Sequence, residues 1–203
     1  MRNHIHRENR MKTMLMTAAL CGLAITAPAQ AADAELTALK TEAAAIVKAF
    51  AGELQGELLS AMKAGGPVNA IGVCNEKAPA IAKMHEDTSG WTVARSSHKL
   101  RSGSNLPDDF TAAVIADFVA REEAGEIAKS LSHAEIVEED GQRLFRFVKA
   151  IPTAQPCLNC HGGDDVKPEV EAKLAELYPD DAARGFSVDQ MRGVFTLTKV
   201  LSE

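Results

Sequence analysis

Two cysteines and a histidine form the most distinctive pattern in this chain of 203 residues. Cys157, Cys160 and His161 have the spacing Cys-x-x-Cys-His, which is the attachment signature of a c-type haem. In such a site each thiol adds to one vinyl group of the porphyrin, and the histidine gives a ring nitrogen to the iron. A chance match in a chain of this composition has a probability on the order of two in a thousand. The pattern therefore predicts one covalently attached haem.

The same residues also fit two other kinds of site. A Cys-x-x-Cys pair can close a disulfide, and three sulfurs with one histidine can hold a zinc ion. Zinc is disfavoured because Cys160 and His161 are adjacent in the chain. Neighbouring residues rarely both reach one tetrahedral ion.

The first 31 residues have the composition of a signal peptide. Basic residues are concentrated in positions 1–12, an apolar run follows, and small residues precede an expected cleavage after Ala31. The apolar run is too short to span a bilayer comfortably, and no other run is long enough to do so. We therefore expect residues 1–31 to be removed and residues 32–203 to form a single haem domain in the periplasm, with no membrane span.

Two details of this leader have alternatives. Translation starts at Met1 or at Met11, because Met11-Lys12 alone would serve as a short basic region. A lipid anchor at Cys21 is the alternative to simple cleavage. Bulky Leu20 disfavours the anchor, because it occupies the preceding position, where a small residue is needed.

Export makes the remaining cysteines informative. Three cysteines remain after cleavage, and an odd free thiol is unusual in an oxidising compartment. A disulfide between Cys157 and Cys160 would leave Cys74 without a partner, whereas two thioethers would leave Cys74 available as the second axial ligand of the iron. The competing ligands are Met62, Met84, Met191, His85, His98 and His133. Cys74 is slightly favoured, and Met84 on the same expected helix is its main competitor.

The overall composition bounds the class of protein. The net charge is −6 at pH 7. Lysines and arginines are scattered, so the chain lacks the basic patch of a nucleic-acid-binding protein or of a protein that binds a membrane surface. The length leaves room for one domain with a sizeable core.

Long helices are expected to begin the mature chain. Apolar residues recur at three- and four-residue steps over residues 33–63 and again over 67–86. Gly65 and Gly66 separate the two runs and are expected to end the first helix. Pro79 is expected to kink or interrupt the second helix, because proline removes a backbone donor.

The remaining elements predict a small antiparallel sheet. A strand is expected over 91–95, a helix over 107–124, a hairpin over 135–148, a helix over 167–177 and a strand over 192–200. The hairpin prediction rests on Asp140-Gly141, a strong tight-turn signal. Its second arm leads into the haem motif, so the haem is expected in a loop that leaves a sheet edge. We predict an α+β fold in which long N-terminal helices pack on the sheet.

The polar loop after the first strand carries three basic residues. Arg95, Lys99 and Arg101 are possible partners of the haem propionates, because arginine pairs bidentately with carboxylates. An ordinary solvated loop is the alternative.

Several segments match one known family across nearly all of the mature chain. They are residues 70–74 with 78–82, 91–97 with 105–108, 157–162, and 177–185 with 192–195. By these residues the chain resembles the exported single-haem c-type proteins with a PAS-like sensor fold, long catalogued as a domain of unknown function. The resemblance implies a PAS-like antiparallel sheet, one covalent haem, and Cys74 as the iron ligand opposite His161. The family tends to have Arg-Asn-Pro where this chain has Arg101-Ser102-Gly103.

Two functions follow from one haem with His161 and Cys74 as ligands. The first is a redox or small-ligand sensor, in which Cys74 leaves the iron on reduction or when a diatomic gas binds, and a separate redox or signalling protein reads the change. The alternative is a periplasmic electron carrier with fixed axial ligands. Many PAS sensors are fused to a kinase or a membrane segment, and the lack of either here modestly favours the carrier. No enzymatic activity is expected, because a six-coordinate iron has no vacant site.

Overall fold

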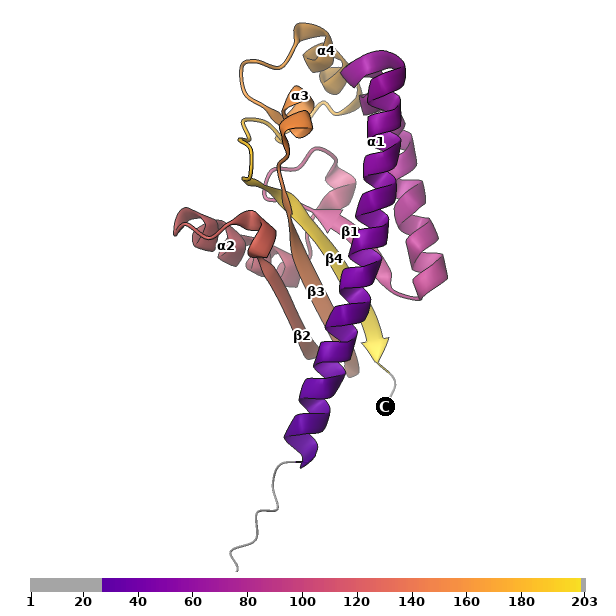
Figure 1. The fold of residues 1–203 in the computed structure, drawn as a ribbon, viewed down its shortest axis with the longest axis vertical. Helices are drawn as coiled ribbons and strands as arrows, with labels where there is room; N and C mark the ends of the chain where they lie inside the picture. Colours follow the sequence, from indigo (N-terminus) through magenta and orange to yellow (C-terminus); the bar gives the residue numbers. More distant parts are fainter. Residues whose placement is uncertain (1–26, 202–203) are drawn as a thin grey trace, which may run out of the picture.

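Long helices and one small sheet make up the fold, which the computed structural model describes for residues 27–201 (Figure 1). The helices are α1 (Ala27–Ser89), α2 (Asp109–Glu123), α3 (Leu158–His161) and α4 (Pro168–Leu177). The strands are β1 (Thr92–Ser96), β2 (Ser132–Glu139), β3 (Gln142–Pro152) and β4 (Met191–Leu201). The predicted α+β class, with an antiparallel sheet and long N-terminal helices packed on it, is confirmed. Its description as PAS-like stays a prediction.

Two helical arms joined at a pair of glycines make up α1. Gly65 has φ −156° and Gly66 has φ 71°, and both depart from helical geometry. The left-handed value at Gly66 favours glycine because a side chain would be strained there. The predicted boundary between the two arms is therefore confirmed. The interruption expected at Pro79 is wrong, because α1 keeps helical dihedral angles through it, while the alternative of a kink at Pro79 stays a prediction.

The four strands form one antiparallel sheet in the order β1-β4-β3-β2. The β2–β3 hairpin turns at Asp140 and Gly141, with φ values of 52° and 76°. Two left-handed residues are what a type I′ hairpin turn requires. The paired strands run from Ser132 to Pro152, which is longer than predicted. The haem motif therefore follows a central strand, β3, and not a sheet edge as expected.

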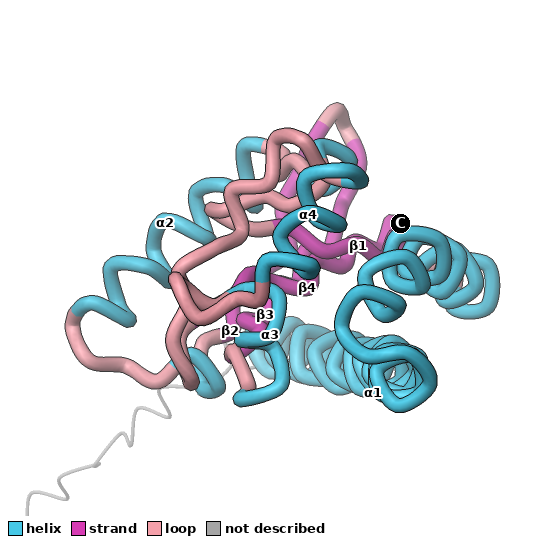
Figure 2. Tube along the Cα trace, turned by 90° about the horizontal axis from the view of Figure 1, so that it is seen from above, coloured by secondary structure: helices cyan, strands magenta, loops and turns pink. Residues whose placement is uncertain are grey.

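Helices cover both faces of this sheet (Figure 2). On one face, Leu39, Val47 and Phe50 of α1 pack in one cluster with sheet residues that include Phe145 and Leu197. The opposite face packs against α2 in a cluster of Val114, Ile115, Phe118, Ala128, Leu131, Val148, Ala150, Met191 and Val194. This division follows the alternation of side chains along the central strands, which places successive residues on opposite faces. The site described below lies at the end of the sheet, where α3 and α4 approach α1 (Figure 1).

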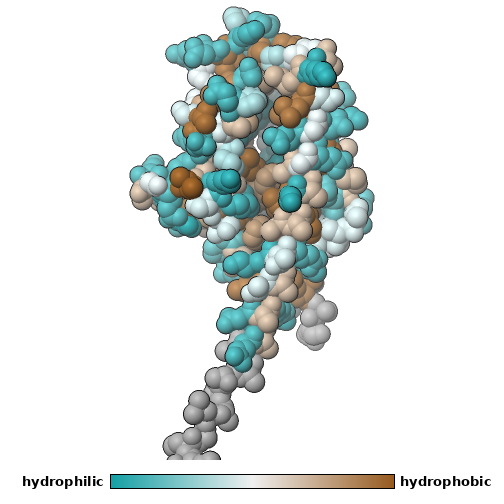
Figure 3. All heavy atoms as spheres, viewed as in Figure 1, coloured by the Kyte–Doolittle hydropathy of each residue, from teal (hydrophilic) through white to brown (hydrophobic). Residues whose placement is uncertain are grey.

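The predicted leader lies mostly outside the described residues. Helix α1 begins at Ala27, so it includes the last residues assigned to the leader, and cleavage after Ala31 stays a prediction. Within residues 27–201 no helix combines the length and the apolar character that crossing a bilayer requires. Hydrophilic residues cover most of the face seen in Figure 3, and apolar residues gather near its middle, beside the long helix.

We expect Phe50→Ala to lower the free energy of unfolding by about 3–5 kcal/mol, because it removes a fully buried ring from the contact between α1 and the sheet. The Phe50 ring also meets the Phe195 ring edge-on at a centroid distance of 5.5 Å. Urea unfolding measures the loss. Leu59→Ala, on the same helix but 49% exposed, serves as the control and should change the free energy by about 0.5 kcal/mol or less. Equal losses in the two variants would contradict this packing.

Candidate functional site

The two motif cysteines lie on a single helical turn that follows β3. Cys157 ends a 3₁₀ turn (Gln155–Cys157) and has helical dihedral angles, and α3 continues from Leu158 to His161. Residues three apart on such a turn lie on the same side of it. The two thiols are therefore presented together, and neither of them is in a disulfide. Gly162 ends the turn, and only glycine fits there because a Cβ would lie 2.7 Å from the Leu158 carbonyl oxygen.

The His161 ring has its two nitrogens in different surroundings. Nδ1 lies 2.9 Å from the Ala183 carbonyl oxygen, and a carbonyl oxygen only accepts, so Nδ1 carries the hydrogen. Nε2 is then unprotonated, and its lone pair faces two guanidinium groups, with Arg192 Nε at 3.3 Å and Arg101 Nη1 at 3.4 Å. Arg192 Nε is also 3.1 Å from Nδ1, but a nitrogen that donates cannot accept, so the productive contact of Arg192 is with Nε2.

The imidazole of His161 is held in its neutral form. Burial is the largest cause, and the positive charges of Arg192 and Arg101 add to it, so that the pKa of His161 falls to about 2. A neutral imidazole is the form that binds a metal. A second partner on the other ring nitrogen, here the Ala183 carbonyl, is the usual way in which proteins orient a metal-binding histidine.

The segment that supplies Ala183 is tied closely to the motif. Gly185 donates its backbone N–H to the Gly162 carbonyl, and Phe186 donates to the His161 carbonyl, each at 2.9 Å. The Phe186 ring also meets the His161 ring edge-on at 6.2 Å. The position of the imidazole is thus set from both its backbone and its ring.

A sheltered ion pair fixes the same segment from the other side. Arg101 donates to both carboxylate oxygens of Asp181, at 3.0 and 3.2 Å, and to the Cys160 carbonyl at 2.6 Å. Asp181 in turn accepts the backbone N–H of Ala183 at 2.9 Å. The side chains of Arg101 and Asp181 are only 13% and 7% exposed. This pair therefore links the basic loop, the haem motif and the carbonyl that orients His161.

Cys74 reaches the same end of the molecule from α1. Ile71, one turn earlier on α1, is buried in a small cluster with Val166, Val170 and Leu174, and Cys160 packs against that cluster. Cys74 is half-buried. The pKa of the Cys74 thiol is raised, with burial as the largest cause, and the nearby charges of Arg95 and Arg101 oppose the rise. The pKa of the Cys160 thiol is raised mainly by burial, with a further rise from Cys74.

The competing ligands lie in other places. Met84 is 43% exposed and lies ten residues after Cys74, which is about 15 Å along a helix. Met191 is fully buried in the α2 cluster, while His85 contacts Glu53 and His133 contacts Glu135. Met62 lies one turn before the glycine pair of α1. His98 is the exception, because its exposed side chain meets the Phe186 ring at 5.8 Å, and Phe186 in turn contacts His161.

The four predicted site residues do not make a zinc centre. Cys74, Cys157 and Cys160 are free thiols. Within the part of the chain that the structure describes, no three histidine, cysteine or acidic side chains converge as metal ligands. The arrangement instead presents the Cys157 and Cys160 thiols on one turn, and the His161 imidazole points to a separate set of contacts.

The loop residues expected to hold propionates are partly engaged elsewhere. Arg101 is paired with Asp181, and Lys99 donates to the Arg184 carbonyl at 3.2 Å. Arg192, Asp181, Ala183 and Phe186 were not predicted as site residues. The contacts of Ala183, Phe186 and Arg192 with His161 cross 22 to 31 positions of sequence, and Asp181 acts on the site through Arg101 and Ala183. Only the resemblance pointed to the segment around Asp181, without giving it a role.

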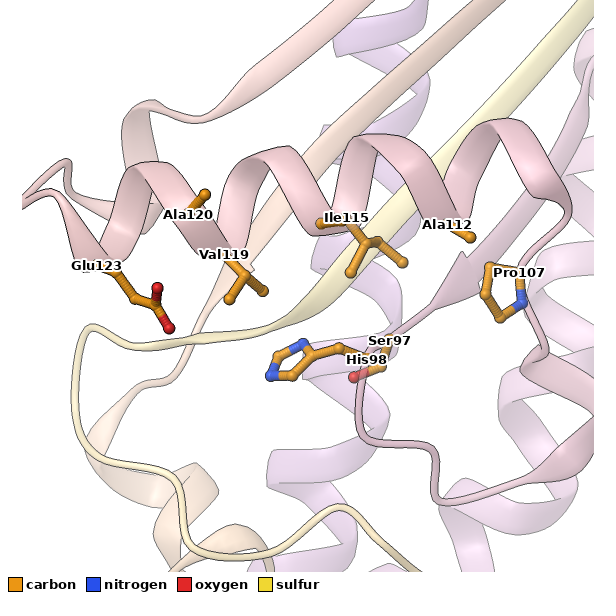
Figure 4. A pocket seen from close by; sticks show the side chains of 9 residues that line it. Ser97, His98, Pro107, Ala112, Ile115, Val119, Ala120 and Glu123 are labelled. Carbon is orange, nitrogen blue, oxygen red and sulfur yellow. The ribbon is translucent and has the colours of Figure 1, made fainter.

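A separate groove lies beneath α2 (Figure 4). It has a volume of about 450 Å³ and is lined by Ser97, His98, Pro107, Ala112, Ile115, Ala116, Val119, Ala120 and Glu123. It includes none of the motif residues and is not the space between Cys74 and His161. We therefore place the candidate site at the motif and not in this groove.

Comparison with known proteins places the chain in a family. Its residues 6–199 match the model of the family described as Tll0287-like: Tll0287. The chain belongs to the Tll0287-like family. The crystal structure of the cyanobacterial heme-protein Tll0287 is similar, with a TM-score of 0.57 and 21% identity over 77% of this chain and 94% of that chain. At this identity the likeness shows the shared fold. No curated protein matches the chain.

Asp181→Asn is expected to lower the free energy of unfolding by about 3–5 kcal/mol, because it leaves the sheltered charge of Arg101 without its carboxylate. Chemical denaturation checks this value. The matched control is Glu171→Gln, which removes a 49% exposed carboxylate from its pair with Arg184 and should cost about 1 kcal/mol or less. An Asp181→Asn loss no larger than that of the control would show that the ion pair does not hold the loop.

Proposed function

We propose that this chain is a periplasmic protein with one covalent haem c, attached through Cys157 and Cys160 and ligated by His161 and Cys74. The observation that carries the proposal is the state of His161. Its Nδ1 donates to the Ala183 carbonyl, which leaves Nε2 unprotonated, with a lone pair that now accepts from Arg192 and that a metal could take. Two free thiols lie on the same turn. Membership of the Tll0287-like family, and a structural neighbour described as a heme-protein, support the same cofactor.

The residues around the motif fit a haem in their chemistry. Cys160 packs against the apolar cluster of Ile71, Val166, Val170 and Leu174, and Phe186 packs against His161. A largely apolar macrocycle requires apolar surroundings of this kind. The guanidinium groups near these apolar side chains are suitable partners for the carboxylates of a haem. When bound, a haem supplies one-electron redox chemistry and, if an axial ligand leaves, a site for a diatomic gas.

We favour a sensor because the two proposed ligands come from different parts of the fold. His161 is fixed by backbone contacts on both sides. Cys74 is held only through its place on α1, a helix that packs on α4 and on the sheet. Departure of the Cys74 thiolate on reduction, or on gas binding, would let this stretch of α1 shift, and a separate redox or signalling protein would read the shift. This role needs no enzymatic activity, nucleic acid or membrane span.

The alternative is an electron carrier whose ligands stay in place. The observation that favours it is the dense hydrogen bonding of residues 181–186, which ties His161 to the Arg101–Asp181 pair. A rigid site of this kind suits repeated one-electron transfer. The two roles differ in whether Cys74 leaves the iron.

We expect the protein made in cells that mature c-type cytochromes to be coloured and to exceed the mass of its polypeptide by one haem. Mass spectrometry of the intact, denatured protein measures this, because a thioether-bound haem survives denaturation. Replacing both Cys157 and Cys160 by alanine should abolish the covalent mass. Cys74→Ala is the matched control, because it removes a thiol from the same site and should leave the haem attached. A colourless native protein with the mass of the bare polypeptide would refute the proposal.

We expect Cys74→Ala to change the visible spectrum of the oxidised protein, because it removes the thiolate from the iron. Met84→Ala should leave that spectrum unchanged. In the sensor, the reduced native protein binds carbon monoxide rapidly and loses its thiolate features. An inert reduced iron would establish the carrier instead, and an unchanged Cys74→Ala spectrum would refute the ligand assignment.

A further inference from the structure

Two arginines beside the candidate site lack a carboxylate partner. Five other arginines of residues 27–201 form ion pairs, namely Arg101, Arg121, Arg143, Arg146 and Arg184. Within this described part of the chain, neither Arg95 nor Arg192 forms one. Both side chains are half-buried, and this burial is the largest cause that lowers the pKa of each guanidinium. A sheltered charge without a partner is costly unless an opposite charge meets it.

The guanidinium of Arg192 is fixed beside His161. It donates from Nη1 to Ser97 Oγ at 3.1 Å, and it lies over the Phe186 ring at 5.3 Å. Its Nε faces His161 Nε2 at 3.3 Å. If that nitrogen's lone pair is used by a metal, this N–H needs another acceptor. An anionic group is the acceptor that would also neutralise the charge.

Arg95 is the second arginine of the same region. Its guanidinium is 5.8 Å from the centre of the Phe50 ring, and it makes no hydrogen bond to the described chain. Its charge acts on Cys74 and on Arg192, so it stands near both proposed features. Arg95 pairs across the sheet with Phe195, three positions from Arg192, which corresponds to about 10 Å along a strand.

We propose that Arg95 and Arg192 form a two-point anion site, and that each pairs with one of the two carboxylates of the bound porphyrin. This inference rests on the proposed haem but goes beyond it, because it names the residues that hold the carboxylates. Arg101 is not one of them, because its Nε and Nη2 already donate to the Asp181 carboxylate. Arg192 exchanges its contact with His161 Nε2 for a carboxylate when the porphyrin is in place. The site therefore takes a dianionic porphyrin and not its neutral diester.

The test compares the haem-loaded native protein with Arg95→Gln and Arg192→Gln by resonance Raman spectroscopy and potentiometry. The bending band of the propionate groups reports directly on their hydrogen bonds. We expect each glutamine variant to shift this band and to lower the reduction potential, because a nearby positive charge favours the reduced iron. Arg95→Lys and Arg192→Lys, which keep the charge, should restore most of the native potential.

Arg143→Gln is the matched control, because Arg143 is paired with Glu35 at a surface away from the motif, and it should leave both readouts unchanged. An unshifted band in both glutamine variants would overturn the two-point site, and a shift in only one would reduce it to a single arginine, which also contradicts the proposal. If Arg192→Gln yields no folded protein, Arg192→Lys gives the Raman comparison at that position, because lysine cannot reproduce a bidentate contact. A native protein without haem would instead refute the proposed function.

Discussion

The hydrogen bond from His161 Nδ1 to the Ala183 carbonyl is the contact on which the whole site depends. It fixes the tautomer of a partly buried imidazole, and the sheltering of the ring among positive charges keeps it neutral. The contact exists only because residues 181–186 fold back onto α3. That return is secured by two backbone hydrogen bonds to the motif and by the pair of Arg101 with Asp181. The sheet matters chiefly because β3 and β4 deliver α3 and this segment to the same end of the molecule.

Charge around the site is arranged unevenly. Arg101 is neutralised within the protein by Asp181 and organises the loop, whereas Arg95 and Arg192 retain their charge without a described carboxylate partner. The first arrangement serves the architecture, and the second suits an anionic cofactor. Cys74 approaches from α1, where its neighbour Ile71 packs in one cluster with Val170 and Leu174 of α4. One end of the sheet thus joins a rigid histidine, a helix-borne thiol and two available cations.

Local patterns in the sequence were enough to predict the elements. Gly65 and Gly66 separate the arms of α1, and Asp140 and Gly141 make the hairpin turn. Each of these features is decided by a few neighbouring residues. A break at Pro79 was wrongly expected, since α1 keeps helical geometry on both sides of it. The prediction also missed Arg192, which contacts His161, and Asp181, which acts through Arg101 and Ala183. Both lie in a distant segment that returns to the motif, and such a return carries no short-range signal.

The most direct measurement of the central claim is X-ray absorption at the iron edge of the oxidised, purified protein. The first coordination shell reports the elements bound to the iron without any substitution in the chain. With His161 and Cys74 as axial ligands, the spectrum contains one sulfur among the nitrogen neighbours, and Cys74→Ala lacks that sulfur. An iron with only nitrogen or oxygen neighbours in the native protein, or a sulfur that survives in Cys74→Ala, would contradict this account.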